Sequence, residues 1–217
     1  MTLSSPESLL LASVAVALVP LLVSVGTCYL KFSIVLSLLK SGFGTQQAPS
    51  SSMVMALSLV MSLVVMQPVI EGTVARVEGI RVDRLGSQPV AELLAQARTV
   101  LGPWRSFLEQ HCGERERDVF RELALRRDGA AVEGKQADAI TTLFAAFVLS
   151  EIKRAFVAAF FLLIPFFVLD LIVSNVLVGM GLTMLSPVVV SLPLKILLFV
   201  STDGWLLLAD GLVKSYG

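Results

Sequence analysis

The longest apolar stretch of the chain runs from residue 155 to residue 194 and contains a single charged residue, Asp170. A helix that spans a membrane needs about 20 apolar residues. The stretch is therefore long enough for two helices that turn back on each other. We expect the rest of the chain to be organised around this hairpin.

The turn of the hairpin is expected between Asn175 and Pro193. Glycine and proline interrupt the helical pattern there, at Gly179, Gly181, Pro187 and Pro193, while most other side chains remain apolar. A turn that faces water is normally polar. We therefore expect this turn to be buried against lipid, against partner subunits or in a constriction that excludes water.

A second hairpin is predicted near the N-terminus. The apolar pattern of residues 8–30 continues past Lys31, the first cation, so a secretory signal with a basic start is not indicated and a long retained helix is expected. Pro20 predicts a kink in this helix. Glycine, proline and serine indicate a turn over residues 41–52, after which the apolar run of residues 53–70 leads back.

The pattern reverses between residues 71 and 141, which hold 23 of the charged residues, twelve acidic and eleven basic. Helices are predicted over residues 90–101, as one amphipathic helix from Pro103 through Leu123, and from about Lys135 onward. Alternating charges around Glu114 to Arg127 are typical of a solvated helix face with pairs four residues apart.

The chain thus divides into three segments. Residues 1–70 are expected to form an N-terminal hydrophobic helical hairpin, residues 71–141 a polar helical domain, and residues 142–217 a C-terminal hydrophobic hairpin. The predicted fold class is all-α, with long kinked helical hairpins and nominally four hydrophobic spans.

Composition supports a membrane-associated protein. Hydrophobic residues make up 55% of the chain, the mean hydropathy is +0.82, and only 16% of residues are charged, against roughly 25% in soluble domains. The net charge of zero gives no electrostatic footprint for nucleic acid. Cys28, Cys112 and the lone His111 have no metal-binding or disulfide spacing, so we expect no metal or cofactor.

Five charged residues lie inside or beside the apolar runs. Each would cost about 2.5 to 3.5 kcal/mol at the centre of a bilayer and so needs a partner or water. We favour structural ion pairs between packed helices over a proton or ion relay. An intramembrane aspartyl protease is a weaker alternative, because neither candidate aspartate has a surrounding motif, and no other catalytic motif is present. The five residues are Lys31, Glu151, Asp170, Lys195 and Asp203.

Several ordered motifs occur in both hydrophobic thirds of the chain. They are GTQQAP at residues 44–49, VMQPV at 65–69, SEIKRAF at 150–156, PFFVLDL at 165–171, MLSPVVVSLPLK at 184–195 and FVSTDGW at 199–205. With these motifs the chain closely resembles the FliP/SctR family, the R-type subunits of the type III secretion export gate. The central segment matches only loosely. A flagellar member would usually carry a cleaved signal peptide, so the virulence injectisome branch is preferred.

The resemblance implies a complex in which several R-type copies assemble with S-type subunits and a T-type subunit. It implies a bacterial inner-membrane protein whose assembled helical cone lies largely on the periplasmic side. Its partners would include other secretion-apparatus components and the secreted proteins. The expected activity is passive: a gated protein-conducting channel for unfolded substrates, with energy supplied elsewhere.

The resemblance also implies a pore gasket at the hairpin tip. The family carries three consecutive methionines there, whereas this chain has Leu182, Thr183 and Met184. An apolar ring could still close by excluding water. The family usually also has a proline where this chain has Ala145, a second departure.

Two further roles are expected from the family pattern. Lys31 and Glu151 occupy positions that the family usually fills with a cation and an acid, which predicts an ion pair. Gln46, Gln47 and Pro49 predict a stiff turn that contacts other subunits, although a plain hairpin loop is the simpler alternative. A secondary transporter, an ion channel or an enzyme would be the competing functions, but no clear internal repeat or catalytic constellation supports them.

Overall fold

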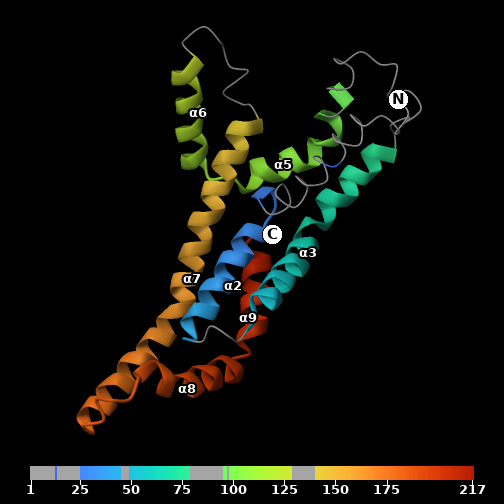
Figure 1. The fold of residues 1–217 in the computed structure, drawn as a ribbon. Coiled ribbons are helices and arrows are strands. Elements are labelled where there is room, and N and C mark those ends of the chain that lie inside the picture. The colour runs from blue at the N-terminus through green and yellow to red at the C-terminus, as the bar shows by residue number, and fades with distance from the viewer. Residues whose placement is uncertain (1–12, 14–24, 45–48, 79–94, 97, 129–139) are drawn as a thin grey trace. The chain divides into compact units, whose positions relative to one another are not determined.

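The computed structural model describes residues 13, 25–44, 49–78, 95–96, 98–128 and 140–217. All regular structure within these residues is helical, which confirms the predicted all-α class (Figure 1). Pro20 and most of the run 8–30, where a long kinked helix is predicted, lie outside the described residues, as do Gln46, Gln47 and the helix start predicted near Lys135.

The apolar patterns form the long helices. Helix α2 is Tyr29–Gly42, α3 is Ser51–Glu78 and α7 is Ile140–Gly179. Two shorter helices, α8 (Pro187–Ser201) and α9 (Gly204–Lys214), complete the C-terminal part. Figure 1 shows α8 folding back from the C-terminal end of α7.

Two described helices, α3 and α7, are long and apolar enough to cross a membrane. The pair α8 and α9, bent by 62° at the junction, would add a third crossing if it acts as one broken span. This places the chain among membrane proteins. The four nominal spans of the sequence prediction include the run 8–30, and they are not established by the described residues.

Contacts group the chain into two compact units. One unit comprises Met1–Cys28 with Val64–Glu151, and the other comprises Tyr29–Leu63 with Ile152–Gly217. The helices α3 and α7 each run from one unit into the other. We describe the units separately.

The first unit contains α5 (Gly102–His111) and α6 (Glu114–Asp128). A proline in the first turn of α5 starts the helix as predicted. Phe107 and Leu108 are buried, and the Phe107 ring lies 5.8 Å from the Phe147 ring. Helix α6 is mostly exposed and carries an Arg126 to Glu122 pair four residues apart, as expected for a solvated face.

The single amphipathic helix predicted from Pro103 through Leu123 is wrong, because the chain breaks between α5 and α6. The Cys112 backbone is extended, and the Gly113 N–H donates to the Ser150 hydroxyl at 3.2 Å. This long-range hydrogen bond satisfies a backbone donor that a continuous helix would have used itself.

The continuous helix predicted through Lys31 is also interrupted. Residues Thr27 and Cys28 form a bend and a turn before α2 begins. The indole N–H of Trp104 donates to the Gly26 carbonyl at 2.9 Å, so a side chain distant in sequence supplies a partner for this carbonyl. The apolar pattern alone carries no sign of this break.

The second unit packs α2 against the C-terminal helices. Its α2 core residues follow helical spacing, with Phe32, Val35, Leu36 and Leu39 almost fully buried. On α8 and α9 the buried positions are likewise four residues apart, at Ser191, Lys195 and Phe199 and at Gly204, Leu208 and Leu212.

The prediction that Pro193 breaks the helix is wrong, since Pro193 lies inside α8. Pro68 and Pro165 lie inside α3 and α7 in the same way. A proline removes one helical hydrogen bond, and membrane helices tolerate this when neighbouring groups satisfy the freed carbonyl. Proline is therefore a weak stop signal in this chain.

Candidate functional site

The turn between α7 and α8 is fixed by a glycine and by backbone hydrogen bonds to the last turn of α7. The Leu182 N–H donates to the Leu177 carbonyl at 2.9 Å and the Gly181 N–H donates to the Val178 carbonyl at 3.0 Å. Gly181 has φ +74. These are the two hydrogen bonds and the left-handed residue of a Schellman motif, which caps the C-terminus of a helix.

Beyond this cap the predicted gasket residues project from the hairpin tip. Met184 is 98% exposed and Leu182 is 41% exposed, and Thr183 is exposed between them. The sequence predicts that this apolar turn is buried, and the described part of this chain does not bury it. Lipid or other subunits would have to do so.

Below the tip, a buried polar cluster joins α7, α8 and the end of α2. The Lys195 ammonium donates to the Asp170 carboxylate at 2.8 Å and to the Gly42 carbonyl at 2.9 Å. The Ser191 hydroxyl donates to the other carboxylate oxygen of Asp170. The Lys195 side chain is 1% exposed and the Asp170 side chain 25%. The structure thus brings together two of the five charged residues singled out from the sequence.

An aromatic cluster lies in the same unit. The ring of Phe43 lies 4.9 Å from that of Phe166 and 5.5 Å from that of Phe199. The adjacent Gly44 has φ +78, and a β-carbon there would clash with the Val188 side chain. The end of α2 is therefore fitted closely against α7 and α8, next to the Lys195 cluster.

Lys31 and Glu151 are both buried, at 3% and 0% exposure. The Lys31 ammonium donates to the Ser215 hydroxyl at 2.5 Å and lies 4.3 Å from the centroid of the Tyr216 ring. Both Lys31 and Glu151 take part in further interactions. Their pairing stays a prediction, because the two residues belong to different compact units.

The remaining predicted site residues are placed as follows. Asp203 is exposed and has φ 50; its backbone carbonyl accepts hydrogen bonds from Leu206 and Leu207 at the start of α9. No cation is brought to its side chain within the described part of the chain. Pro49 borders a cavity of about 240 Å³ together with Trp205, whereas Gln46 and Gln47 lie outside the described residues.

A protein-family model matches most of the chain. The family model described as FliP family matches residues 11–212. The chain belongs to the FliP family. This confirms the resemblance that the sequence motifs indicated.

Curated relatives of this FliP family chain are similar over nearly their whole lengths. Yop proteins translocation protein R of Yersinia pestis is 37% identical over 92% of this chain and 91% of that protein. Surface presentation of antigens protein SpaP of Shigella flexneri is 35% identical over the same shares. Hypersensitivity response secretion protein HrcR of Ralstonia nicotianae is 35% identical over 96% of each chain.

Sequence reasoning missed two members of the polar cluster in this FliP family chain. Ser191 lies four residues before Lys195 and so shares its helix face, a signal that was present in the sequence. The Gly42 carbonyl had no such signal, because a free backbone acceptor in the last turn of a helix cannot be distinguished by residue type.

Proposed function

We propose that this protein is the R-type core subunit of a type III secretion export gate, of the virulence injectisome branch. The support is the family match over residues 11–212 and the relatives named for protein translocation or secretion. Other parts of the secretion apparatus are accordingly its partners.

We further propose that several copies assemble with S-type and T-type subunits into a cone in or above the bacterial inner membrane, largely on its periplasmic side. Exposed apolar side chains along α7 support the proposal that a partner subunit or lipid contacts this helix. Phe160, Phe161 and Leu171 are each more than 60% exposed, and apolar surface of this extent marks protein or membrane contact sites. Residues 71–141 would form a polar domain facing the periplasm, between hydrophobic hairpins at 1–70 and 142–217.

The gate itself is assigned to the α7–α8 tip. One observation carries this assignment: Met184 is 98% exposed at the end of a hairpin whose turn is capped by its own backbone. Repeated around a ring, Leu182, Thr183 and Met184 would form a narrow apolar constriction, which resists wetting and ion passage. A methionine side chain is flexible enough to adapt to an unfolded substrate and repack behind it. The channel is passive, so the chain contributes no catalytic step.

The test is a double substitution, Leu182→Ala with Met184→Ala, in a type III secretion strain that lacks its own R-type subunit. We expect the complex to assemble, as judged on native gels, but to leak ions, as measured by electrical conductance of the purified gate in planar bilayers. Thr183 carries a hydroxyl and so contributes less to the seal.

The matched control replaces two exposed leucines away from the tip, Leu197→Ala with Leu206→Ala, which are 68% and 69% exposed. This variant removes similar apolar surface and should stay closed. An assembled tip variant as tight as the parent would place the closure in another subunit. A purified monomer that conducts ions or small solutes would favour a transporter or ion channel instead.

The turn containing Gln46, Gln47 and Pro49 is proposed to contact another subunit. A photocrosslinking amino acid at Gln46 or Gln47 should capture a secretion component in cells, whereas the same probe at Arg126, on the solvated α6 face, should not. Capture at neither glutamine would leave a plain hairpin loop as the correct description.

A further inference from the structure

The hairpin tip between α7 and α8 carries the most exposed methionine among the described residues. Met184 is 98% exposed, against 67% for Met180 just before the turn. On α3, Met61 and Met66 are 6% and 2% exposed, and both cysteines of the chain are buried. A thioether is oxidised where an oxidant can reach it, whereas buried sulfur is protected. Met184 is therefore the described methionine most open to a dissolved oxidant.

The local backbone explains this exposure. The Leu185 N–H donates to the Leu182 carbonyl at 3.3 Å, which closes a four-residue turn with Thr183 and Met184 at its two central positions. The Gly181 cap ends α7 before this turn, and α8 begins after it. The central residues of a tight turn project away from the chain. Met184 is thus held outward by backbone hydrogen bonds, without packing of its own side chain.

We propose that Met184 is an oxidation site through which a peroxide opens the gate; this inference rests on the gate assignment given above. A lone pair of the Met184 sulfur attacks one oxygen of hydrogen peroxide, and the O–O bond breaks as the S–O bond of a sulfoxide forms. The second oxygen leaves as water and takes both peroxide protons. The sulfur loses two electrons and the peroxide gains them, so the peroxide is the only oxidant required.

The product differs from methionine in the property on which the seal depends. A sulfoxide is polar and accepts hydrogen bonds from water, whereas the thioether is apolar. A narrow constriction resists wetting only while its lining is apolar. Leu182 and Thr183 contain no sulfur, so one residue in each copy decides whether the ring is wetted. A seal across a water-filled passage has water at both mouths, and hydrogen peroxide, a small neutral molecule, reaches Met184 from either side.

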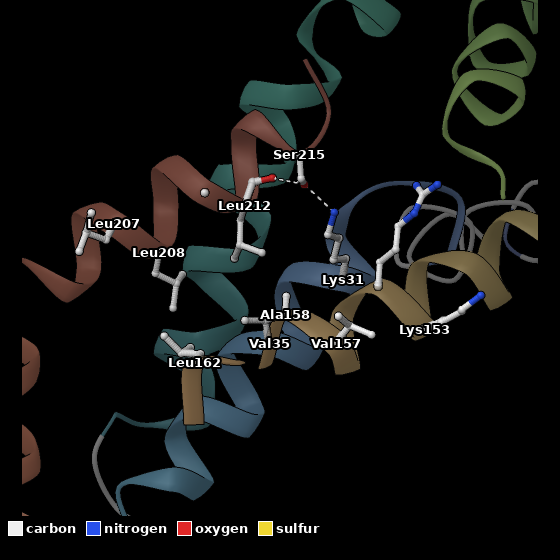
Figure 2. Close-up of a pocket in the computed structure, with 12 residues that line it drawn as sticks. Lys31, Val35, Lys153, Val157, Ala158, Leu162, Leu207, Leu208, Leu212 and Ser215 are labelled. Carbon is white, nitrogen blue, oxygen red and sulfur yellow. Dashed lines mark hydrogen bonds between the residues drawn. The ribbon is translucent and has the colours of Figure 1, made fainter. Parts of the chain in front are cut away.

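The helices that carry the tip are held by groups that peroxide does not attack under these conditions. Helices α7 and α8 are joined by the ion pair of Asp170 with Lys195. Helix α2 is joined to α9 by the hydrogen bond from Lys31 to Ser215, drawn as a dashed line in Figure 2. Ammonium, carboxylate and hydroxyl groups survive peroxide treatment that converts a thioether. Oxidation therefore changes the lining of the seal and leaves the hairpin in place.

The test uses the assembled complex purified from the type III secretion strain, so that the ring is present. Hydrogen peroxide is added, and peptide mass spectrometry follows each methionine by its gain of one oxygen, about 16 Da. Met184 should be converted at a rate roughly ten-fold or more above that of Met61 and Met66, in line with their exposed fractions. Ion conductance of the complex in planar bilayers should rise in step with the conversion of Met184.

Three variants separate the sulfur of Met184 from other effects of peroxide. Met184→Leu keeps an apolar side chain but has no sulfur, so the rise in conductance on adding peroxide should be lost. Met184→Gln places a polar side chain of similar length at the seal and should leak before any peroxide is added. The matched control, Met180→Leu, removes the neighbouring exposed methionine and should respond to peroxide as the parent does. Native gels check that every variant is assembled.

Three results would overturn the proposal. They are conversion of Met184 no faster than that of Met61 and Met66, full conversion of Met184 without a rise in conductance, and an unchanged peroxide response in the Met184→Leu variant. Failure of the gate assignment would be seen separately, because the Leu182→Ala, Met184→Ala variant would then be as tight as the parent without peroxide. A leaky double variant beside an oxidised but closed parent would retain the gate and reject the oxidation site alone.

Discussion

The cluster around Lys195 predicts that Asp170→Asn destabilises the protein strongly. The Lys195 side chain is 1% exposed, and its ammonium has the Asp170 carboxylate at 2.8 Å and the neutral Gly42 carbonyl at 2.9 Å. Removing one partner of a buried ion pair typically costs about 3 to 5 kcal/mol. Asparagine keeps one acceptor oxygen, and the Asp170 side chain is 25% exposed to water. We therefore expect the lower limit, about 3 kcal/mol.

The same chain offers a control pair with the same chemistry on the surface. Lys214 and Asp210 also lie 2.8 Å apart, but their side chains are 75% and 50% exposed. An exposed pair contributes about 0 to 1 kcal/mol, so Asp210→Asn should change the free energy of unfolding by less than about 1 kcal/mol. The difference between the two variants isolates the effect of burial.

The measurement is denaturant-induced unfolding of the purified chain in detergent, followed by circular dichroism, for the parent and both variants. A lower midpoint at an unchanged slope reports a change in stability. Adding Lys195→Met to Asp170→Asn should recover part of the loss, because the double variant no longer buries an unpaired cation. If Asp170→Asn costs no more than Asp210→Asn, the buried pair does not join α7 to α8 as argued.

Two other substitutions test local features. If Glu151 is the predicted partner of Lys31, Glu151→Ala should impair assembly or secretion, because loss of one partner of a buried pair costs about 3 to 5 kcal/mol. Exchanging the two charges, Lys31→Glu with Glu151→Lys, should then restore function. Normal secretion by the Glu151→Ala variant would make the pair incidental. Gly44→Ala should lower the denaturation midpoint more than Gly181→Ala. Both have positive φ, which costs roughly 1 to 2 kcal/mol for a non-glycine residue, but only the added carbon at position 44 meets another side chain, Val188. Equal losses would contradict the steric contribution.

The hydrophobic pattern predicts a turn after α7 because the length of an apolar run and the glycines that interrupt it are local features of the sequence. They do not depend on contacts between distant residues. The limits of the turn were too wide, with Pro193 placed in it rather than inside α8. The breaks at Cys28 and Gly113 were missed for another reason. They coincide with hydrogen bonds from Trp104 to Gly26 and from Gly113 to Ser150, and such contacts between distant residues have no signature in a local pattern.

The sequence identified which charges in the apolar runs need partners, but it did not identify the partners. Asp170 and Lys195 were expected to be neutralised because an isolated charge in an apolar surrounding is costly. Their pairing with each other depends on how far α8 folds back along α7, and this is set by the length of the turn and by packing. The Gly42 carbonyl enters only because α2 ends beside them.

The hairpin combines a fixed base with an uncovered tip, and this division bears on how a passive gate could work. At the base, the Asp170 to Lys195 pair is buried and tied to α2, so moving α8 relative to α7 would expose or break an ion pair. At the tip, the Gly181 cap orders the turn through backbone hydrogen bonds alone, without any side chain from elsewhere in the described chain. A seal made by Met184 could then yield to a passing polypeptide through side-chain rotation, while the helices that carry it remain in place.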